Sequence, residues 1–416
     1  MHARLPMRTP ARLRLAAGLA AGLALAVAAT GCGSQGKYTR QQVSLAEKKM
    51  SVMKSATEWE MGRQAFLAGD LDKAMKKVEA SLAINDSVAK SHVLKARILI
   101  ERGQMGEALS SLKMAQTLEP DSLEAHYYSG VVYERLDKPE DALRCFRTAA
   151  DLDEYASQYA IAAAEMLVDL GRLQEAKDYL ATRPTYEHSA GIRQTLGHIA
   201  MIEGDPRTAA VRFGEARLLS PDDTAILLDL VHAQIAAGQH REAESNLNVL
   251  LRDPSMEGRR DLRLLRARCL TRLERPVDAR DIYAQLVKGD EGASDVAAWI
   301  GLAETSYAIG DDSGARKAAS RVVALAPDRA EGHAVVALVE RRAGEPAKAL
   351  AAAERAIKAR PAMPTLWVLR GVLLGDLNRY NEARAAIAHA AKLDPDNPHI
   401  ARALRVESPL ANVPTD

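Results

Sequence analysis

Alanine recurs along this 416-residue chain at a nearly constant interval, which limits what the chain can fold into. Successive members of the series lie 33, 34 or 36 residues apart, and six of the nine intervals are 34. The series is Ala74, Ala108, Ala142, Ala176, Ala209, Ala243, Ala279, Ala315, Ala349 and Ala383. A fixed period of this length indicates one small structural unit that has been repeated and stacked.

Other residue types keep the same phase. Twelve residues before each alanine stands a small residue, with Val231 as the exception: Gly62, Ala96, Gly130, Ala164, Gly197, Ala267, Ala303, Ala337 and Gly371. Five residues before it, seven copies have glycine, which tolerates the positive φ of a turn that ends a helix: Gly69, Gly103, Gly171, Gly204, Gly238, Gly310 and Gly344. Each unit is therefore predicted to be a helix, a turn and a second helix, and small residues stand where two helix axes approach to about 8–10 Å.

The unit resembles the tetratricopeptide repeat, most clearly in "SLEAHYYSGVVYERLDKPEDALRCFRTAADLDE" from Ser122 and "PTLWVLRGVLLGDLNRYNEARAAIAHAAKLDP" from Pro364. The resemblance implies an all-α fold, a right-handed α-solenoid of about ten helix-turn-helix repeats. The alanine frame places these units in residues 55–397, with starts at 55, 89, 123, 157, 190, 224, 260, 296, 330 and 364. Extra residues at 253–259 and 289–295 are expected to loosen the flanks of the seventh unit.

The N-terminus carries an export signal. Four arginines precede an uncharged run, Leu15 to Ala29, which ends in small residues before Cys32. A basic segment, an apolar core and small residues are typical of a secretory signal, and this one resembles the signal of bacterial lipoproteins. Residues 1–31 are the predicted signal peptide and Cys32 the lipid-bearing residue. Two alternatives stay open: ordinary cleavage after Ala26-Val27-Ala28, or retention of the apolar run as a membrane anchor.

The regions outside the repeats are expected to be short. Residues 32–54 hold the lipid-attachment cysteine, a short tether and a leading helix. Residues 398–407 are predicted to form a capping helix, since the end of a repeat stack needs a polar outer face. Residues 408–416 are expected to be a disordered tail.

The charge of the chain argues against a nucleic-acid partner, and the positions of its cysteines argue against a disulfide within the repeats. Removal of the signal, which holds four arginines and no acid, takes the formal net charge from +1 to −3. A nucleic-acid partner is not expected, because it would require a basic excess. Cys145 and Cys269 lie four repeats apart, too far for the roughly 7 Å between Cα atoms that a disulfide allows, and are expected to be packed as small apolar residues.

No catalytic motif, cofactor motif or metal-ligand spacing occurs in the sequence. We therefore expect no enzyme, no cofactor and no small-molecule substrate. His198 and His232 share one repeat position, but a metal site needs three or four protein ligands, and no metal is expected. His92, His126 and His333 share another position, where other units have Trp299 and Trp367; the resemblance implies that these rings pack between helices.

The resemblance also places a partner-binding groove along the first helices of the units. In units four to six this face carries mostly apolar residues, an arrangement that generally marks a partner site when it is exposed. The candidate groove residues are Ile161, Val168, His198, Met201, Leu228, His232 and Ile235, with Ile202 and Ala236 beside them. The alternative is that these side chains belong to the core between tightly packed units.

The sequence therefore predicts a lipid-anchored scaffold of the cell envelope, an outer-membrane lipoprotein facing the periplasm. It would bind a protein partner in its groove, for assembly of an envelope, secretion, pilus or polysaccharide-export complex. A soluble periplasmic regulator that sequesters an enzyme is the alternative.

Overall fold

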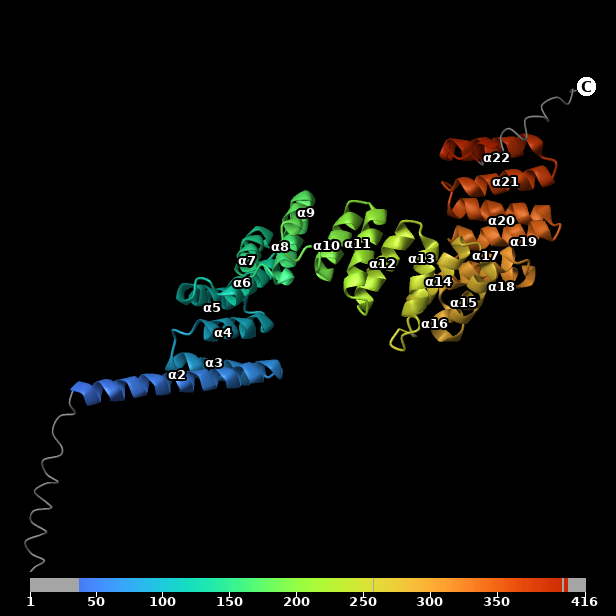
Figure 1. Cartoon of the computed structure of the whole chain (residues 1–416). Helices are drawn as coiled ribbons and strands as arrows, with labels where there is room; N and C mark the ends of the chain where they lie inside the picture. Colours follow the sequence, from blue (N-terminus) through green and yellow to red (C-terminus); the bar gives the residue numbers. More distant parts are fainter. Residues whose placement is uncertain (1–36, 257, 399, 403–416) are drawn as a thin grey trace, which may run out of the picture. The chain divides into compact units, whose positions relative to one another are not determined.

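The computed structural model describes residues 37–256, 258–398 and 400–402, and every regular element among them is a helix. The all-α prediction is confirmed for these residues. The chain divides after Leu170 into two compact units. The helices of the first are α2 (Lys37–Leu67), α3 (Leu71–Ile84), α4 (Ala89–Glu101), α5 (Met105–Leu118), α6 (Leu123–Arg135), α7 (Pro139–Leu152) and α8 (Ser157–Asp169). Each packs against the next along the chain (Figure 1).

The second unit continues the same pattern of short turns between paired helices. Its helices are α9 (Leu173–Ala181), α10 (Ala190–Ile202), α11 (Pro206–Leu219), α12 (Thr224–Ala236), α13 (His240–Leu250), α14 (Arg260–Arg272), α15 (Pro276–Leu286), α16 (Gly289–Ala293), α17 (Val296–Ala308), α18 (Asp312–Leu325), α19 (Ala330–Arg342), α20 (Pro346–Ala359), α21 (Pro364–Asp376) and α22 (Tyr380–Leu393). Neighbouring helices again pack side by side, as the α19–α22 stack shows (Figure 1).

The turn inside each helix pair has one backbone conformation. Five positions before the repeated alanine, φ lies between 72° and 84° in the seven units that have glycine there. The other three units keep the positive φ with Asp137, Glu274 and Asn378. The next amide then donates to the carbonyl five residues earlier, as Arg275 does to Leu270 at 3.0 Å. The repeat geometry thus imposes a left-handed backbone conformation even on residues with a Cβ atom, for which this conformation is unfavourable.

The two helices of a pair meet where a small residue faces a large one. A Cβ atom added at Gly130 would lie 2.5 Å from the ring of Phe146, and one at Gly197 equally close to the ring of Phe213. Both rings are only 1% exposed. The glycines are therefore required by the close approach of the helices rather than by φ.

In five of the ten repeats, a ring N–H at one shared position binds the backbone six residues earlier, just before the first helix of the repeat. The Nε2 atoms of His92, His126 and His333 donate to the carbonyl oxygen six residues earlier, at 2.7, 2.8 and 3.1 Å. The indole nitrogens of Trp299 and Trp367 donate to the equivalent carbonyls at 3.3 and 2.7 Å. Histidine and tryptophan alternate here because each presents a ring N–H at the same place.

The segment at 289–295 does not loosen the seventh unit as expected. It forms the short helix α16, whose Gly292 is buried against the backbone of Leu286 and Val287. Arg260 donates to the Leu286 carbonyl at 2.8 Å and to Asp295 at 3.0 Å. Those bonds fix the extra residues to the neighbouring helices.

At the N-terminal end, the leading helix is not separate from the first repeat. α2 runs without a break from Lys37 to Leu67. At the other end, residues 398 and 400–402 are helical, and Ile400 is 3% exposed and packs against Ile387 and Ala390. The rest of the predicted capping helix, residues 403–407, lies outside the described residues.

The predicted signal peptide at residues 1–31, Cys32 and the tail at 408–416 also lie outside the described residues. Among the helices that the structure describes, none has both the length and the apolar character needed to cross a bilayer.

Candidate partner-binding groove

Exposed apolar and histidine side chains gather on the first helices α10 and α12 of the second unit. On α10, His198 is exposed, and Met201 and Ile202 are 37% and 58% exposed. On α12, His232 is exposed, while Leu228 and Ile235 are half-buried. Residues three or four positions apart share one face of a helix, so each helix presents one mixed face.

These two faces border a cavity of about 400 Å³. It is lined by His198, Met201, Phe213, Leu228, Asp229, His232, Arg259 and Asp261. We call it the α10–α12 cavity. Its lining combines apolar surface with a few polar groups, which is typical of sites that bind a ligand and fix its orientation.

Asp229 is the polar centre of this cavity. Its Oδ2 atom accepts hydrogen bonds from Gln194 Nε2 at 2.8 Å and from His198 Nε2 at 3.0 Å. The His198 ring also meets the Phe213 ring edge-on, with centroids 5.1 Å apart. These contacts from two sides hold His198 in a defined orientation at the cavity wall.

Arg259 and Asp261 form the rim of the cavity on the α14 side. Two N–H groups of the Arg259 guanidinium donate to the carboxylate of Asp261, at 2.9 and 2.7 Å. These hydrogen bonds hold the pKa of Asp261 below its usual range. The pair therefore stays ionised at neutral pH and gives the rim both signs of charge.

Five of the seven predicted groove residues lie on α10 and α12, and four of these line the cavity: His198, Met201, Leu228 and His232. Leu228 and Ile235 also pack against the buried core of the second unit. Part of each side chain thus packs in the core, and part remains accessible on the face of α12. Ile161 and Val168 lie on α8 of the first unit and are also half-buried.

Sequence reasoning missed four lining residues: Phe213, Asp229, Arg259 and Asp261. Asp229 carried a signal, since it is the one charged residue of α12, "TAILLDLVHAQIA". Phe213 belongs to the second helix of its repeat, Arg259 to the extra segment 253–259, and Asp261 to the following repeat. Only the packing of α11, α12 and α14 reveals that they reach this cavity.

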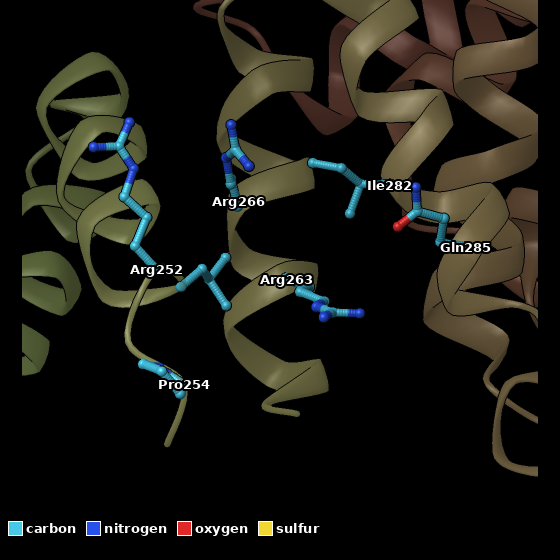
Figure 2. Close-up of a pocket in the computed structure, with 7 residues that line it drawn as sticks. Arg252, Pro254, Arg263, Arg266, Ile282 and Gln285 are labelled. Atoms are coloured by element: carbon cyan, nitrogen blue, oxygen red, sulfur yellow. The ribbon is translucent and has the colours of Figure 1, made fainter. Parts of the chain in front are cut away.

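A separate cavity of about 430 Å³ lies between the end of α13, α14 and α15 (Figure 2). Figure 2 shows Arg263 and Arg266 extending from one helix, with Ile282 and Gln285 opposite and Arg252 and Pro254 on the other side. Arg266 is bound to Glu244 at 2.9 Å. Pro254 of the extra segment 253–259 is part of its lining, and the cavity contains none of the predicted groove residues.

Within residues 37–256, 258–398 and 400–402, no group of three or more His, Cys, Asp and Glu side chains is placed to hold a metal ion. Burial raises the pKa of the Cys145 and Cys269 thiols to about 11. Thiolate, the nucleophilic form, is therefore scarce at neutral pH. The chemistry that the α10–α12 cavity offers is binding through apolar contact and hydrogen bonds.

Several solved structures are similar to this chain at low sequence identity. A tetratricopeptide-repeat protein of Thermus thermophilus is 19% identical, and the match covers 44% of this chain and 99% of that chain with a TM-score of 0.36. PilF of Pseudomonas aeruginosa is 19% identical over 48% of this chain and 91% of its own, with a TM-score of 0.40. PilW, a type IV pilus biogenesis factor, is 19% identical over 48% and 93%, with a TM-score of 0.41.

No curated protein matches the sequence. Family models do. A model described as tetratricopeptide repeat matches residues 93–157, 228–295 and 337–398, and a second with the same description matches residues 200–255. Together they cover more than half of the chain. The matched segments fall on the helix pairs described above, and the chain belongs to the tetratricopeptide-repeat family.

Proposed function

We propose that this protein is a non-enzymatic scaffold that binds a protein partner in the groove on α10 and α12. Repeats of this family are generally protein-binding modules. The observation that carries the proposal is the exposed apolar face of Met201 and Ile202 beside the α10–α12 cavity. Water-exposed apolar surface of this kind is stabilised when a partner covers it.

Photo-crosslinking in cells tests the groove. A photoreactive amino acid at Met201 is expected to give one predominant covalent adduct with a partner protein. The same residue at Leu218, which is 84% exposed on α11, is the matched control. Leu228→Ala should reduce the adduct from position 201 while circular dichroism stays unchanged. Equal adducts from both positions, insensitive to Leu228→Ala, would show that the groove is not the partner site.

We further propose that Cys32 carries a lipid, and that the scaffold acts in the cell envelope as an outer-membrane lipoprotein facing the periplasm. The support is the order of a basic segment, an apolar core and small residues immediately before Cys32. Assembly of an envelope complex, such as a secretion, pilus or polysaccharide-export apparatus, is the role that fits an anchored scaffold. The alternative is a soluble periplasmic regulator, favoured by the ordinary cleavage sequence Ala26-Val27-Ala28.

Substitution of Cys32 distinguishes the lipid-anchored scaffold from the soluble periplasmic regulator. Cys32→Ser is expected to move the protein from the membrane pellet to the soluble fraction, or to leave an unprocessed precursor. Fractionation and mass spectrometry of the N-terminal peptide provide the measurement. Cys145→Ser, which removes a thiol inside the repeats, is the control. Unchanged membrane residence and normal processing of Cys32→Ser would overturn the lipid anchor.

A further inference from the structure

A second cavity in the same unit is built from the same repeat positions as the α10–α12 cavity. Its volume is about 520 Å³, and its lining includes Arg268, Thr271 and Arg272 of α14, Tyr283 of α15, and Ile300, Gly301 and Glu304 of α17. We call it the α14–α17 cavity. Arg268 stands where α10 has His198, and Tyr283 where α11 has Phe213. The two cavities are therefore equivalent sites, two repeats apart.

The chemistry of the two cavities differs. The α10–α12 cavity has Met201 and His232 where the α14–α17 cavity has Thr271 and Glu304. The second cavity adds Arg272, one turn beyond Arg268 on the same face of α14. The wall thus changes from apolar and histidine side chains to arginines over two repeats.

Both arginines are available to a ligand. Arg268 and Arg272 are exposed, and neither forms an ion pair or a hydrogen bond with any residue that the structure describes. Two arginines on the first helix α19 are engaged, by contrast: Arg341 binds Asp376 at 2.6 Å, and Arg342 binds Asp312 at 2.7 Å. An unpaired guanidinium presents donors that match a carboxylate.

The carboxylates of this cavity do not satisfy these arginines. Glu331 lies 3.6 Å from Arg360 and 4.0 Å from Arg329, so its charge is already balanced. Burial raises the pKa of Glu304, and the negative charge of Glu331 adds to this effect while Arg272 opposes it. Glu304 is nevertheless exposed to solvent, and it forms no ion pair with Arg272. The lining holds three arginines, Arg329 included, against the two carboxylates of Glu304 and Glu331. The cavity retains a surplus of positive charge.

We propose that the groove binds an extended acidic segment of a partner protein, with an apolar side chain in the α10–α12 cavity and a carboxylate at Arg268 and Arg272. This rests on the groove being the partner site. First helices of neighbouring repeats lie about 10 Å apart, so the two cavities are roughly 20 Å apart. An extended chain covers this distance in about six residues. A free anion would occupy only one end.

Defined peptides test the proposal on the purified full-length protein. The probe is a fluorescein-labelled decapeptide with two leucines near one end and two glutamates six residues further on. Two matched peptides replace the glutamates by glutamine or the leucines by serine. The glutamate peptide is expected to bind about tenfold more tightly than the glutamine peptide by fluorescence anisotropy, because charge-assisted hydrogen bonds to arginine are the stronger ones.

Protein variants test whether the preference for glutamate depends on Arg268 and Arg272. Arg268→Gln combined with Arg272→Gln should abolish the preference for glutamate, and Glu304→Gln should increase it. Arg207→Gln combined with Arg355→Gln removes the same charge from two exposed arginines outside both cavities and should change nothing. Arg268→Glu combined with Arg272→Glu should favour a peptide with lysine in place of glutamate. Thermal melts confirm that each variant remains folded.

The outcomes distinguish this inference from the function on which it rests. If the leucine residues matter but glutamate and glutamine bind alike, the groove stands and the acidic partner is wrong. If none of the peptides binds above the level of the serine control, both are wrong. If phosphatidylglycerol vesicles, and no peptide, bind in a way that depends on Arg268 and Arg272, the anion is a lipid headgroup and the peptide proposal is overturned.

Discussion

Phe213→Ala is expected to lower the free energy of unfolding by about 3–5 kcal/mol, the usual loss when a buried aromatic side chain is removed and a cavity remains. Phe213 is 1% exposed and packs against Gly197 so closely that a Cβ atom there would lie 2.5 Å from the ring. Removal of the ring leaves Gly197 without its packing partner, and this loss of contact between α10 and α11 is the reason for the expected effect.

Urea unfolding followed by circular dichroism measures this loss. Because each repeat touches only its neighbours, unfolding can proceed in more than one transition, and the shift should appear in the one that includes α10–α13. Leu218→Ala on the same helix is the control, since Leu218 is 84% exposed and should change stability by less than about 0.5 kcal/mol. Similar losses for both variants would contradict the packing described for α11.

The sequence period predicted the helix pairs because their geometry repeats. α4 and α6 begin at Ala89 and Leu123, the residues from which the alanine frame counts the second and third units. The frame also locates the turns: Glu274 adopts a positive φ at the offset where other units have glycine. A local reading of Glu274 would not suggest this conformation. The phase of the repeat supplies the constraint.

The pattern does not predict what lies between units. The residues at 289–295 break the period, and only the structure shows that they contain the helix α16 and that Arg260 donates to Asp295. Similarly, nothing in the sequence distinguishes α2 as one continuous helix from a leading helix followed by the first repeat. Insertions and ends depend on tertiary contacts that no repeat template contains.

The candidate site was predictable as a face but not as a cavity. The repeat frame selects His198, Met201 and His232 as residues of one wall, because helical spacing decides which side chains share a face. Whether Leu228 and Ile235 are exposed depends on how closely α12 packs to its neighbours, which spacing does not encode. The hydrogen bond from His198 to Asp229 crosses between two helices and has no counterpart in the repeat pattern.

Gly130→Ala is expected to lower the free energy of unfolding by up to about 2 kcal/mol, although alanine is the better helix former by about 1 kcal/mol. The new Cβ atom would lie 2.5 Å from the Phe146 ring, and such overpacking costs about 1–3 kcal/mol. Gly214→Ala is the control. Gly214 lies inside α11 with open space around it, so alanine there should stabilise the protein.

A double-mutant cycle shows whether size matching is the cause. The second repeat, which begins at residue 89, has Ala96 and the fully buried Leu112 at the positions of Gly130 and Phe146. Gly130→Ala combined with Phe146→Leu recreates that pair, and should be more stable than the sum of the two single losses predicts, by about 1 kcal/mol or more. Additive losses would mean that the ring shifts freely to accommodate the methyl group. Seven of the ten helix pairs place a small residue opposite a large one at these two positions. A positive coupling would therefore identify the size of this pair as a feature that sets how closely the two helices of such a repeat pack.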